Sequence, residues 1–340
     1  MKKLIKIIGS LSLLVLVLTG CDSGKKEAAC KDIKIATMTW ASAQLMAEVD
    51  KLVLEKGFGC NVEIVQADTV PAFTGMNEKG SPDLIPELWS NSFINPLNKA
   101  VKEGRLHVLN KGPITGLGEG WWVTQAFRKK HPEIKTVQDL IKRPDLFPHP
   151  EDKSKGAFVT CPTGWACELT NANLFRAFEM EKKGWKLLSP GSGAGLDGTV
   201  AKASERGENW VGYYWSPTAV VGKYNLVKLD WGIPFGGNDN WDNCIVKPEK
   251  DCANPKPTAW ITPAVNTVIT DKFKKSADEN AITYLQKRTY PGDVMNGMLV
   301  YINDNQAEGP DAAIEFLKKH ESVWKTWVPS DIAAKIKKSL

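Results

Sequence analysis

Several tryptophans stand where the faces of their rings could bind a cation. Trp40 follows an apolar run at residues 33–38, Trp89 ends a Pro-Glu-Leu-Trp motif, and Trp215 ends a Gly-Tyr-Tyr-Trp motif. Such runs are typical of β-strands, and ligands of parallel α/β sheets bind beyond the carboxyl ends of the strands. Because indole faces carry negative π density, they hold weakly hydrated cations such as a trimethylammonium group. We therefore expect these rings to line one cleft; the alternative is that they fill a core.

A fourth tryptophan, Trp165, lies in a short loop between Cys161 and Cys167. A strand-type run at residues 157–160 precedes the loop, and helical periodicity follows it. A disulfide across the loop would fix the direction of the ring, while the free amides of Ala166 and Cys167 would face a bound group. On this segment alone a structural disulfide with a core tryptophan is an equal alternative, but the other strand-end tryptophans favour binding. We expect core positions for Trp185, Trp210, Trp324 and Trp327.

The elements that must position these rings follow from alternating strand-type and helix-type segments. The alternation runs over residues 33–109 and again over residues 157–229, which predicts mainly parallel sheets flanked by helices. A glycine-rich stretch at 112–120 and a polar loop at 232–257 separate the two series. We predict an α/β protein of two lobes joined by two hinge crossings. Lobe 1 is expected to comprise residues 31–118 and 258–340, and lobe 2 residues 119–257.

The N-terminal residues have the pattern of an export signal with a lipid anchor. Three lysines precede an apolar run at residues 7–18, and small residues lead to Cys21, as in the lipobox of bacterial lipoproteins. We predict a signal peptide over 1–20, lipidation of Cys21 and a tether over 21–30, with a simple secretory signal as the alternative. Removing the signal takes away three of the 44 Lys and Arg and none of the 39 Asp and Glu. The remaining chain is nearly neutral, which disfavours nucleic acid as a partner.

Six of the seven cysteines remain after Cys21, an even number that suggests disulfides in an exported chain. The first two of them each precede a predicted strand, and neighbouring parallel strands would bring them side by side; the other four would close two local loops. The predicted disulfides are Cys30–Cys60, Cys161–Cys167 and Cys244–Cys252. Metal binding is the less favoured alternative because no Cys-x2-Cys or histidine pairing accompanies these residues. No cofactor is expected.

The sequence resembles the glycine betaine/proline betaine substrate-binding proteins of bacterial ABC transporters over most of residues 31–340. The resemblance is carried by the cysteine loop around Trp165, the Tyr-Trp-Ser-Pro element at Trp215, the Pro-Glu-Leu-Trp element at Trp89 and the lipoprotein start. It implies a type II periplasmic-binding-protein fold that closes on a betaine, whose quaternary ammonium group sits in a cage of these three tryptophans. The carboxylate would lie near the amides of Ala166 and Cys167. The resemblance also implies an ABC permease as partner. The predicted lipid on Cys21, with no later apolar stretch long enough to cross a bilayer, predicts attachment to the membrane by lipid only, in the periplasm or on the outer face of the cytoplasmic membrane.

Glu119, in a Gly-Glu-Gly-Trp-Trp motif at the predicted hinge, leaves the polar end of the ligand open. A carboxylate near the cleft favours a cation or a hydrogen-bond donor, which would suit choline or trimethylamine N-oxide better than an anionic tail. A solvent-facing hinge residue is the equal alternative. No arginine stands in a motif that identifies it as the partner of a ligand carboxylate. Trp40 and Trp122 would supply further walls of the site.

An exported hydrolase is the rival interpretation from another class. The four histidines stand in no nucleophile or metal motif, and the Gly-Ser-Gly-Ala-Gly run at residues 191–195 is neither a nucleophile elbow nor a phosphate loop. We therefore expect a monomeric binding protein without catalytic activity that delivers a small methylated ammonium solute to a permease.

Overall fold

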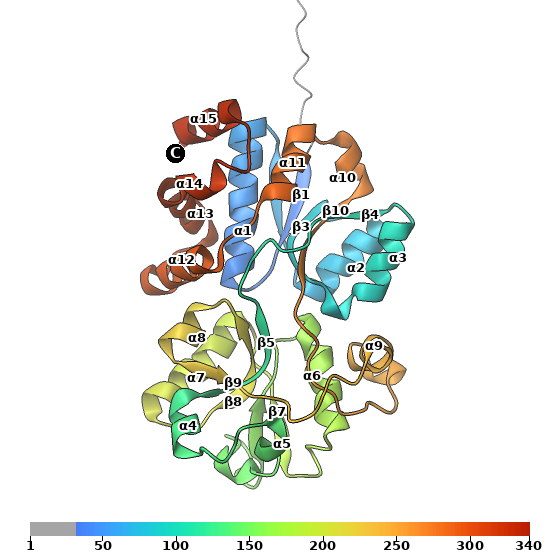
Figure 1. Cartoon of the computed structure of the whole chain (residues 1–340), viewed down its shortest axis with the longest axis vertical. Coiled ribbons are helices and arrows are strands. Elements are labelled where there is room, and N and C mark those ends of the chain that lie inside the picture. The colour runs from blue at the N-terminus through green and yellow to red at the C-terminus, as the bar shows by residue number, and fades with distance from the viewer. Residues whose placement is uncertain (1–31) are drawn as a thin grey trace, which may run out of the picture.

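The computed structural model describes residues 32–340, so that the predicted signal peptide, Cys21 and Cys30 lie outside the described residues. Two five-stranded sheets form the framework, in the strand orders β2-β1-β3-β10-β4 and β7-β6-β8-β5-β9. Helices flank each sheet, and we call the first sheet with its helices lobe 1 and the second lobe 2. The lobes lie end to end along the long axis of the molecule (Figure 1). The expected two-lobed α/β fold is confirmed.

Lobe 1 contains the N-terminal and C-terminal parts of the described chain. Its strands are β1 (Ile33–Thr37), β2 (Val62–Gln66), β3 (Leu84–Trp89), β4 (Leu106–Asn110) and β10 (Val265–Thr270). Its first helices are α1 (Ala41–Leu52, continued by a π-turn at Val53–Gly57), α2 (Thr69–Lys79) and α3 (Ile94–Lys102). The later ones are α10 (Asp271–Ser276), α11 (Glu279–Lys287), α12 (Gly292–Asn305), α13 (Gly309–Lys319), α14 (Glu321–Trp324) and α15 (Ser330–Ser339).

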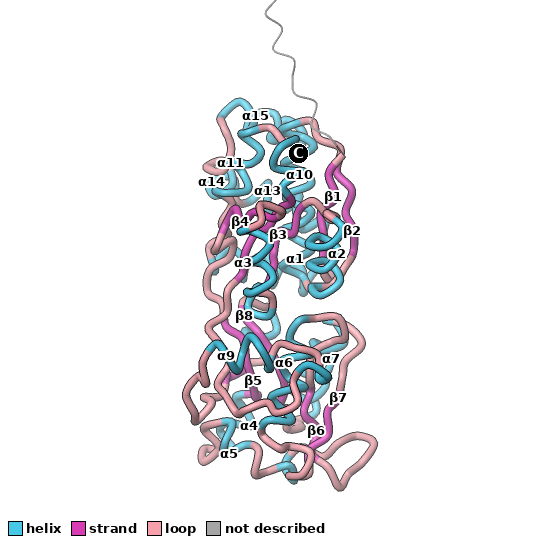
Figure 2. Tube along the Cα trace, turned by 90° about the vertical axis from the view of Figure 1, so that its right-hand side faces the viewer, coloured by secondary structure: helices cyan, strands magenta, loops and turns pink. Residues whose placement is uncertain are grey.

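Lobe 2 is formed by the middle of the chain. Its strands are β5 (Gly118–Thr124), β6 (Gly156–Val159), β7 (Trp185–Leu188), β8 (Val211–Ser216) and β9 (Leu226–Lys228). Its helices are α4 (Gln125–Lys130), α5 (Val137–Leu140), α6 (Ala166–Ala177), α7 (Gly193–Arg206), α8 (Ala219–Lys223) and α9 (Asn238–Asn240, followed by a π-turn at Trp241–Ile245). Figure 2 shows the strands of the two lobes as two separate groups, each with helices and loops beside it.

Both sheets are mainly parallel, as the sequence predicts, with one strand in each running antiparallel to the others. β1 pairs in parallel with β2 and β3, and β6 pairs in parallel with β7 and β8. The antiparallel strands are β10, which lies between β3 and β4, and β5, which lies between β8 and β9. These are the strands by which the chain enters each sheet from the other lobe, so they run opposite to the parallel strands.

Alternation along the strands builds the two sides of lobe 1. Ile33 and Ile35 of β1 pack in a core with α1 and the C-terminal helices, while Ala36 belongs to the core on the other face of the sheet, with α2 and α3. Successive side chains of a strand point to opposite faces, which explains this division. Figure 1 shows the same layers, with α12–α15 beside α1 on one side and α2 and α3 on the other. The carboxyl ends of β1 and β3 face lobe 2, because Thr39, just after β1, and Trp89, at the end of β3, both lie near Trp165 of lobe 2.

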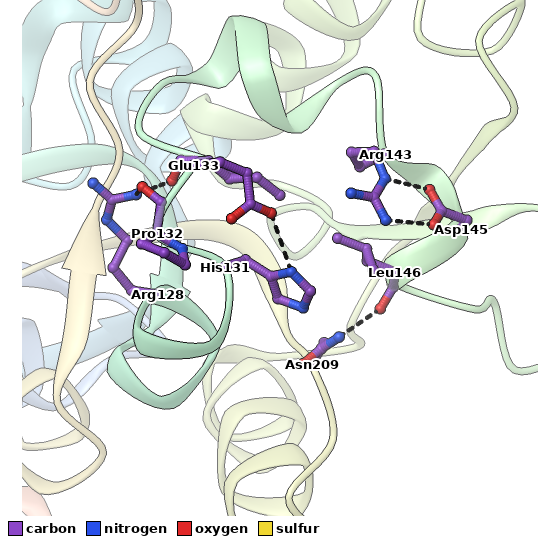
Figure 3. Close-up of polar contacts among 9 residues, drawn as sticks. Arg128, His131, Pro132, Glu133, Arg143, Asp145, Leu146 and Asn209 are labelled. Atoms are coloured by element: carbon purple, nitrogen blue, oxygen red, sulfur yellow. Dashed lines mark hydrogen bonds and ion pairs between the residues drawn. The ribbon is translucent and has the colours of Figure 1, made fainter.

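Polar contacts hold the segments that follow α4 and α5 in lobe 2 (Figure 3). Arg143 binds Asp145 through two hydrogen bonds of 2.9 and 2.8 Å, and Asn209 Nδ2 donates to the carbonyl of Leu146 over 2.9 Å. His131 Nδ1 lies 3.3 Å from Glu133 Oε1. These groups hold loops of lobe 2 together and lie outside the cavity described below.

Two of the predicted disulfides are confirmed. Cys161 is bonded to Cys167 and Cys244 to Cys252, with Cα–Cα distances of 5.9 and 4.5 Å. Cys60 is also disulfide-bonded, and its predicted pairing with Cys30 stays a prediction. Within residues 32–340, no helix combines the length and the apolar character needed to cross a membrane.

Candidate ligand-binding site

A pocket lies between the lobes, with about 450 Å³ of empty space when the open solvent at its mouth is included. Most of its wall is aromatic, and we call it the aromatic cavity. Its lining residues are Trp40, Thr69, Trp89, Asn91, Ser92, Glu119, Trp165, Ala166, Cys167, Tyr213, Trp215, Trp241 and Trp260. Of these lining residues, all within the described part of the chain, none is a lysine, an arginine or a histidine. A solute in this cavity would meet ring faces, a few hydroxyl and amide groups and one carboxyl group.

The indole rings at the centre of the cavity stand at steep angles to one another. The rings of Trp40 and Trp165 are 4.9 Å apart with an interplanar angle of 69°, and those of Trp165 and Trp215 are 5.2 Å apart at 80°. Tyr213 stacks beside Trp215 at 6.2 Å and contacts Trp260 at 5.5 Å. Edge-to-face contacts are a favoured arrangement of aromatic pairs. They turn the ring faces in different directions, as the walls of a box require.

Strand-to-helix turns position one cavity ring in each lobe, Trp40 in lobe 1 and Trp165 in lobe 2. Trp40 is the N-cap residue of α1 and Trp165 is the N-cap residue of α6, both with extended backbones and neither with a side-chain capping bond. The first amides of a helix have no partner within it, and the helix dipole makes this end partly positive. Ala166 and Cys167 line the cavity at the start of the 12-residue helix α6. This end of the cavity therefore suits the acceptor end of a solute.

The carboxyl group of Glu87 lies behind two of the rings. Glu87 is fully buried, and its Oε1 accepts hydrogen bonds from Trp40 Nε1 and Trp89 Nε1, both over 2.9 Å, and from Ser42 Oγ over 3.0 Å. Burial raises the pKa of Glu87 to about 7, an effect that these hydrogen bonds and the charge of Arg288 only partly oppose. The indole N–H groups are thereby satisfied away from the cavity, which leaves ring faces toward it.

Glu119 is the carboxyl group of the cavity wall. It lies at the start of β5, is 8% exposed, and accepts a hydrogen bond from Tyr213 Oη over 2.7 Å. Burial raises the pKa of Glu119 to about 7, although Tyr213, Trp260 and Lys228 act in the opposite direction. At neutral pH this group can therefore either accept a hydrogen bond as a carboxylate or donate one as a carboxylic acid.

Contacts across the cleft show that the lobes are closed on each other. Trp165 Nε1 of lobe 2 donates to Thr39 Oγ1 of lobe 1 over 3.0 Å, and Thr39 donates from its hydroxyl and its amide to Asp68 Oδ1. The amide of Val70 donates to the carbonyl of Gly164 over 3.2 Å. Gly164 has a φ of +92°, a conformation that favours glycine. The cysteine loop thus docks directly on lobe 1.

A second close approach between the lobes occurs at Gly193, the first residue of α7. A Cβ atom at this position would lie 2.5 Å from the carbonyl oxygen of Thr39 and 3.2 Å from the ring of Trp165. No side chain fits there without movement of the opposite backbone. Gly193 therefore sets how far the lobes can close around the rings.

The structure brings most of the sequence-predicted site residues together. Trp40, Trp89, Glu119, Trp165, Ala166, Cys167 and Trp215 all line the aromatic cavity. Trp122 does not, because it lies on the face of β5 opposite to Glu119, as the alternation of side chains along a strand requires. Trp185, Trp210, Trp324 and Trp327 are buried away from the cavity, as expected for core residues.

Sequence reasoning missed several lining residues. They are Thr69, Asn91, Ser92, Tyr213, Trp241 and Trp260. Tyr213 could have been predicted from the sequence, since it lies two residues before Trp215 on one strand and so shares its face. Trp241 and Trp260 belong to the long segment between β9 and β10, where no periodicity reports on side-chain direction.

Comparison with known proteins identifies the family. A family model described as the substrate-binding domain of the ABC-type glycine betaine transport system matches residues 31–319. The chain belongs to this family. It is therefore a substrate-binding protein of an ABC-type transport system, a class that works outside the cytoplasm together with a membrane permease, and the predicted resemblance is confirmed.

Solved structures of similar fold support the two-lobed architecture of this binding protein. A choline-binding protein of an ABC transporter, in complex with choline, has a TM-score of 0.69 at 14% identity, with 91% of this chain and 97% of that chain covered. The glycine betaine/L-proline-binding protein of Borrelia burgdorferi has a TM-score of 0.69 at 17% identity, with 90% and 99% covered. A lactococcal protein in its closed conformation with glycine betaine has a TM-score of 0.63 at 18% identity, with 88% and 100% covered. At these identities the likeness concerns the fold.

Proposed function

We propose that this binding protein captures a small methylated ammonium or sulfonium solute of the glycine betaine type in the aromatic cavity. The observation that carries the proposal is the convergence of Trp40, Trp89, Trp165 and Trp215 on one cavity, whose lining within residues 32–340 includes no lysine or arginine. A methylated onium group is weakly hydrated and needs no hydrogen bond, so ring faces suit it. Each desolvated contact between such a cation and an indole contributes about 1–2 kcal/mol.

The polar end of the solute has two possible partners in the cavity. The amides of Ala166 and Cys167 at the start of α6 suit a carboxylate, as in glycine betaine. Glu119 supports a second candidate ligand, choline or trimethylamine N-oxide, because it is the carboxyl group of a wall without basic side chains. An ionised Glu119 accepts from the hydroxyl of choline and attracts its charge, whereas a protonated Glu119 donates to the oxygen of an N-oxide.

The remaining features of the proposal concern the setting of the protein. We propose that it is a monomer, that it binds its solute without chemical change, and that a lipid on Cys21 anchors it to the membrane. In support of binding without catalysis, none of His107, His131, His149 and His320 lines the aromatic cavity. The boundaries of the lobes are proposed at 31–118 with 258–340, and at 119–257.

A ligand panel tests the proposed function. We expect titration of the tryptophan fluorescence with glycine betaine, choline, trimethylamine N-oxide and dimethylsulfoniopropionate to give a saturable change with at least one of them. The reason is that a cation placed among the indoles of the cavity alters their surroundings. An absence of response to all four, checked by calorimetry, would remove the basis of the cage.

The pH dependence of ligand preference is expected to identify the role of Glu119. As pH rises from 6 to 8 through the pKa of about 7 of Glu119, the carboxylate form replaces the acid. Choline binding should therefore strengthen and trimethylamine N-oxide binding weaken, changing the ratio of their dissociation constants by about tenfold or more. Calorimetric titration of both ligands at four pH values measures this ratio.

The control is the Glu119→Gln variant, which keeps the size and the acceptor oxygen of the side chain and does not titrate. Its ratio of dissociation constants should change with pH clearly less than that of the wild type, and the change that is left would come from Glu87, whose pKa burial also raises to about 7. A wild-type ratio that stays constant between pH 6 and 8 would show that Glu119 does not face the polar end of either ligand.

A further inference from the structure

Glu87 is separated from the aromatic cavity by the rings that it holds. It belongs to β3, is fully buried and does not line the cavity. One of its oxygens, Oε1, receives three donors, of which two are the indole N–H groups of Trp40 and Trp89. The other oxygen, Oε2, has no hydrogen-bond partner among the described residues. This concentration of donors on one atom links two walls of the cavity to a single buried group.

The two linked rings come from different elements. Trp40 stands before α1, and Trp89 is the last residue of β3. An indole without a partner for its N–H can rotate about its side-chain bonds, and fixing such a side chain on binding costs conformational entropy. A shared acceptor fixes both rings relative to each other before a ligand arrives. The bonds to Glu87 therefore preorganise part of the site.

The charge of Glu87 acts on the same two rings. A hydrogen bond from an N–H group to a carboxylate is stronger than one to a neutral acceptor, and it increases the electron density of the indole. The π faces of the ring then attract a cation more strongly, since this attraction is electrostatic. An ionised Glu87 also lies behind the rings as a negative charge in a region from which water is excluded, where Coulomb interactions are weakly screened.

Other buried ionisable groups surround Glu87 on its lobe 1 side. Arg288 forms an ion pair of 2.8 Å with Asp50, which also accepts a hydrogen bond from Tyr284. Arg288 further donates to Thr267 over 2.9 Å. Because this guanidinium is already paired with Asp50, it offsets the charge of Glu87 only in part. Tyr290, a further ionisable neighbour, is held neutral by a pKa that burial raises.

We propose that Glu87 is the positioning residue and buried counter-charge of the binding site, fixing Trp40 and Trp89 and, when ionised, polarising both indoles toward the bound cation. This inference rests on the proposed function. The role of Glu87 deepens the proposed function, because it explains why the site would prefer a cation to a neutral solute of the same shape. The residue responsible does not line the cavity and so touches neither solute.

Release of a proton on binding follows from the same geometry. Burial raises the pKa of Glu87 to about 7, so that part of the population is protonated at neutral pH. A cation in front of the rings favours the ionised form and lowers this pKa. Binding of a cation near pH 7 should therefore release part of a proton from Glu87, and binding of a neutral solute should not.

The experiment compares the cation choline with 3,3-dimethylbutan-1-ol, in which carbon replaces the charged nitrogen. Calorimetric titrations with tetramethylammonium chloride isolate the cationic group alone. In the wild type, we expect choline to bind better than its neutral analogue. The Glu87→Gln variant keeps the acceptor oxygen for the three donors and removes the charge, so it should lose about tenfold in affinity for both cations at pH 8. Its affinity for the neutral analogue should stay within about twofold of wild type.

A second variant and a second measurement separate positioning from charge. Glu87→Met removes both the acceptor and the charge and should weaken all three probes. Titrations of tetramethylammonium in buffers of different ionisation enthalpy should reveal proton release at pH 7 in the wild type and in Glu119→Gln, and a smaller release in Glu87→Gln. If Glu87→Met does not fold, the Glu87→Gln comparison still decides the proposal.

Two outcomes would overturn this inference in distinguishable ways. If the wild type binds the cations and Glu87→Gln matches it in affinity, in cation preference and in proton release, Glu87 has no such role and the proposed function stands. If the wild type binds none of the methylated solutes, the proposed function fails and the role of Glu87 fails with it.

Discussion

Replacement of Trp165 by alanine is expected to weaken the binding of a methylated ammonium solute by about 100-fold, because the change removes a cation–π wall and a cross-lobe hydrogen bond together. The ring of Trp165 contacts Trp40 and Trp215, and its Nε1 donates to Thr39 of the opposite lobe. Titration of the remaining tryptophan fluorescence with the preferred solute of the panel measures the loss, and circular dichroism reports whether the fold is kept.

Two further variants divide this effect between its causes. Trp165→Phe keeps a ring face but removes the N–H group, so its loss should be intermediate, about tenfold. Trp185→Phe is the matched control, since Trp185 is buried in lobe 2 and donates to the carbonyl of Ile141 without lining the cavity. A dissociation constant of Trp165→Ala equal to that of the wild type would assign the ring to packing alone.

A methyl group at Gly193 is expected to reduce affinity by hindering closure. In Gly193→Ala the new Cβ atom would lie 2.5 Å from the carbonyl oxygen of Thr39 in the opposite lobe. Overpacking of this kind typically costs about 1–3 kcal/mol, which corresponds to a loss of about 5- to 150-fold in affinity if it falls on the closed state. Small-angle X-ray scattering with saturating solute should show a less compact protein than the wild type.

The same helix offers a matched control for this change. Gly198 also lies in α7, and a Cβ atom there would have no neighbour within 4 Å. Gly198→Ala should therefore bind as the wild type does, while alanine stabilises the helix by about 0.5–1 kcal/mol relative to glycine. Equal affinities of the two alanine variants would mean that the contact at Gly193 does not limit closure. If Gly193→Ala instead has a lower melting temperature than the wild type without ligand but binds the solute equally well, the strain lies within lobe 2, where the new Cβ atom would also approach the ring of Trp165.

Local patterns in the sequence account for a large part of the site. Trp40 and Trp89 follow or end a strand, and Trp215 is the last residue but one of β8; strands that run in parallel bring such positions to one edge of a sheet. Cys161 and Cys167 are close together in the sequence, so their pairing could be predicted from the short loop between them. Tyr213 could have been added, because the period of two along a strand places it on the same face as Trp215. By the same rule Trp122 could have been excluded, since it lies three residues after Glu119 on one strand and therefore on the opposite face.

The sequence by itself determined that this chain forms two α/β lobes with tryptophans at their facing strand ends, because strand and helix periodicity and strand direction are local properties. Only the tertiary structure decided which distant groups join them. Trp241 and Trp260 enter from an irregular segment, and the closure of the cysteine loop on Asp68 and Val70 depends on how the lobes meet. The role of Glu87 is also tertiary, because in the sequence it is one more residue of a strand. In the fold it is a buried carboxyl group to which two walls of the cavity donate, since burial and shared hydrogen bonds arise only when separate elements pack together.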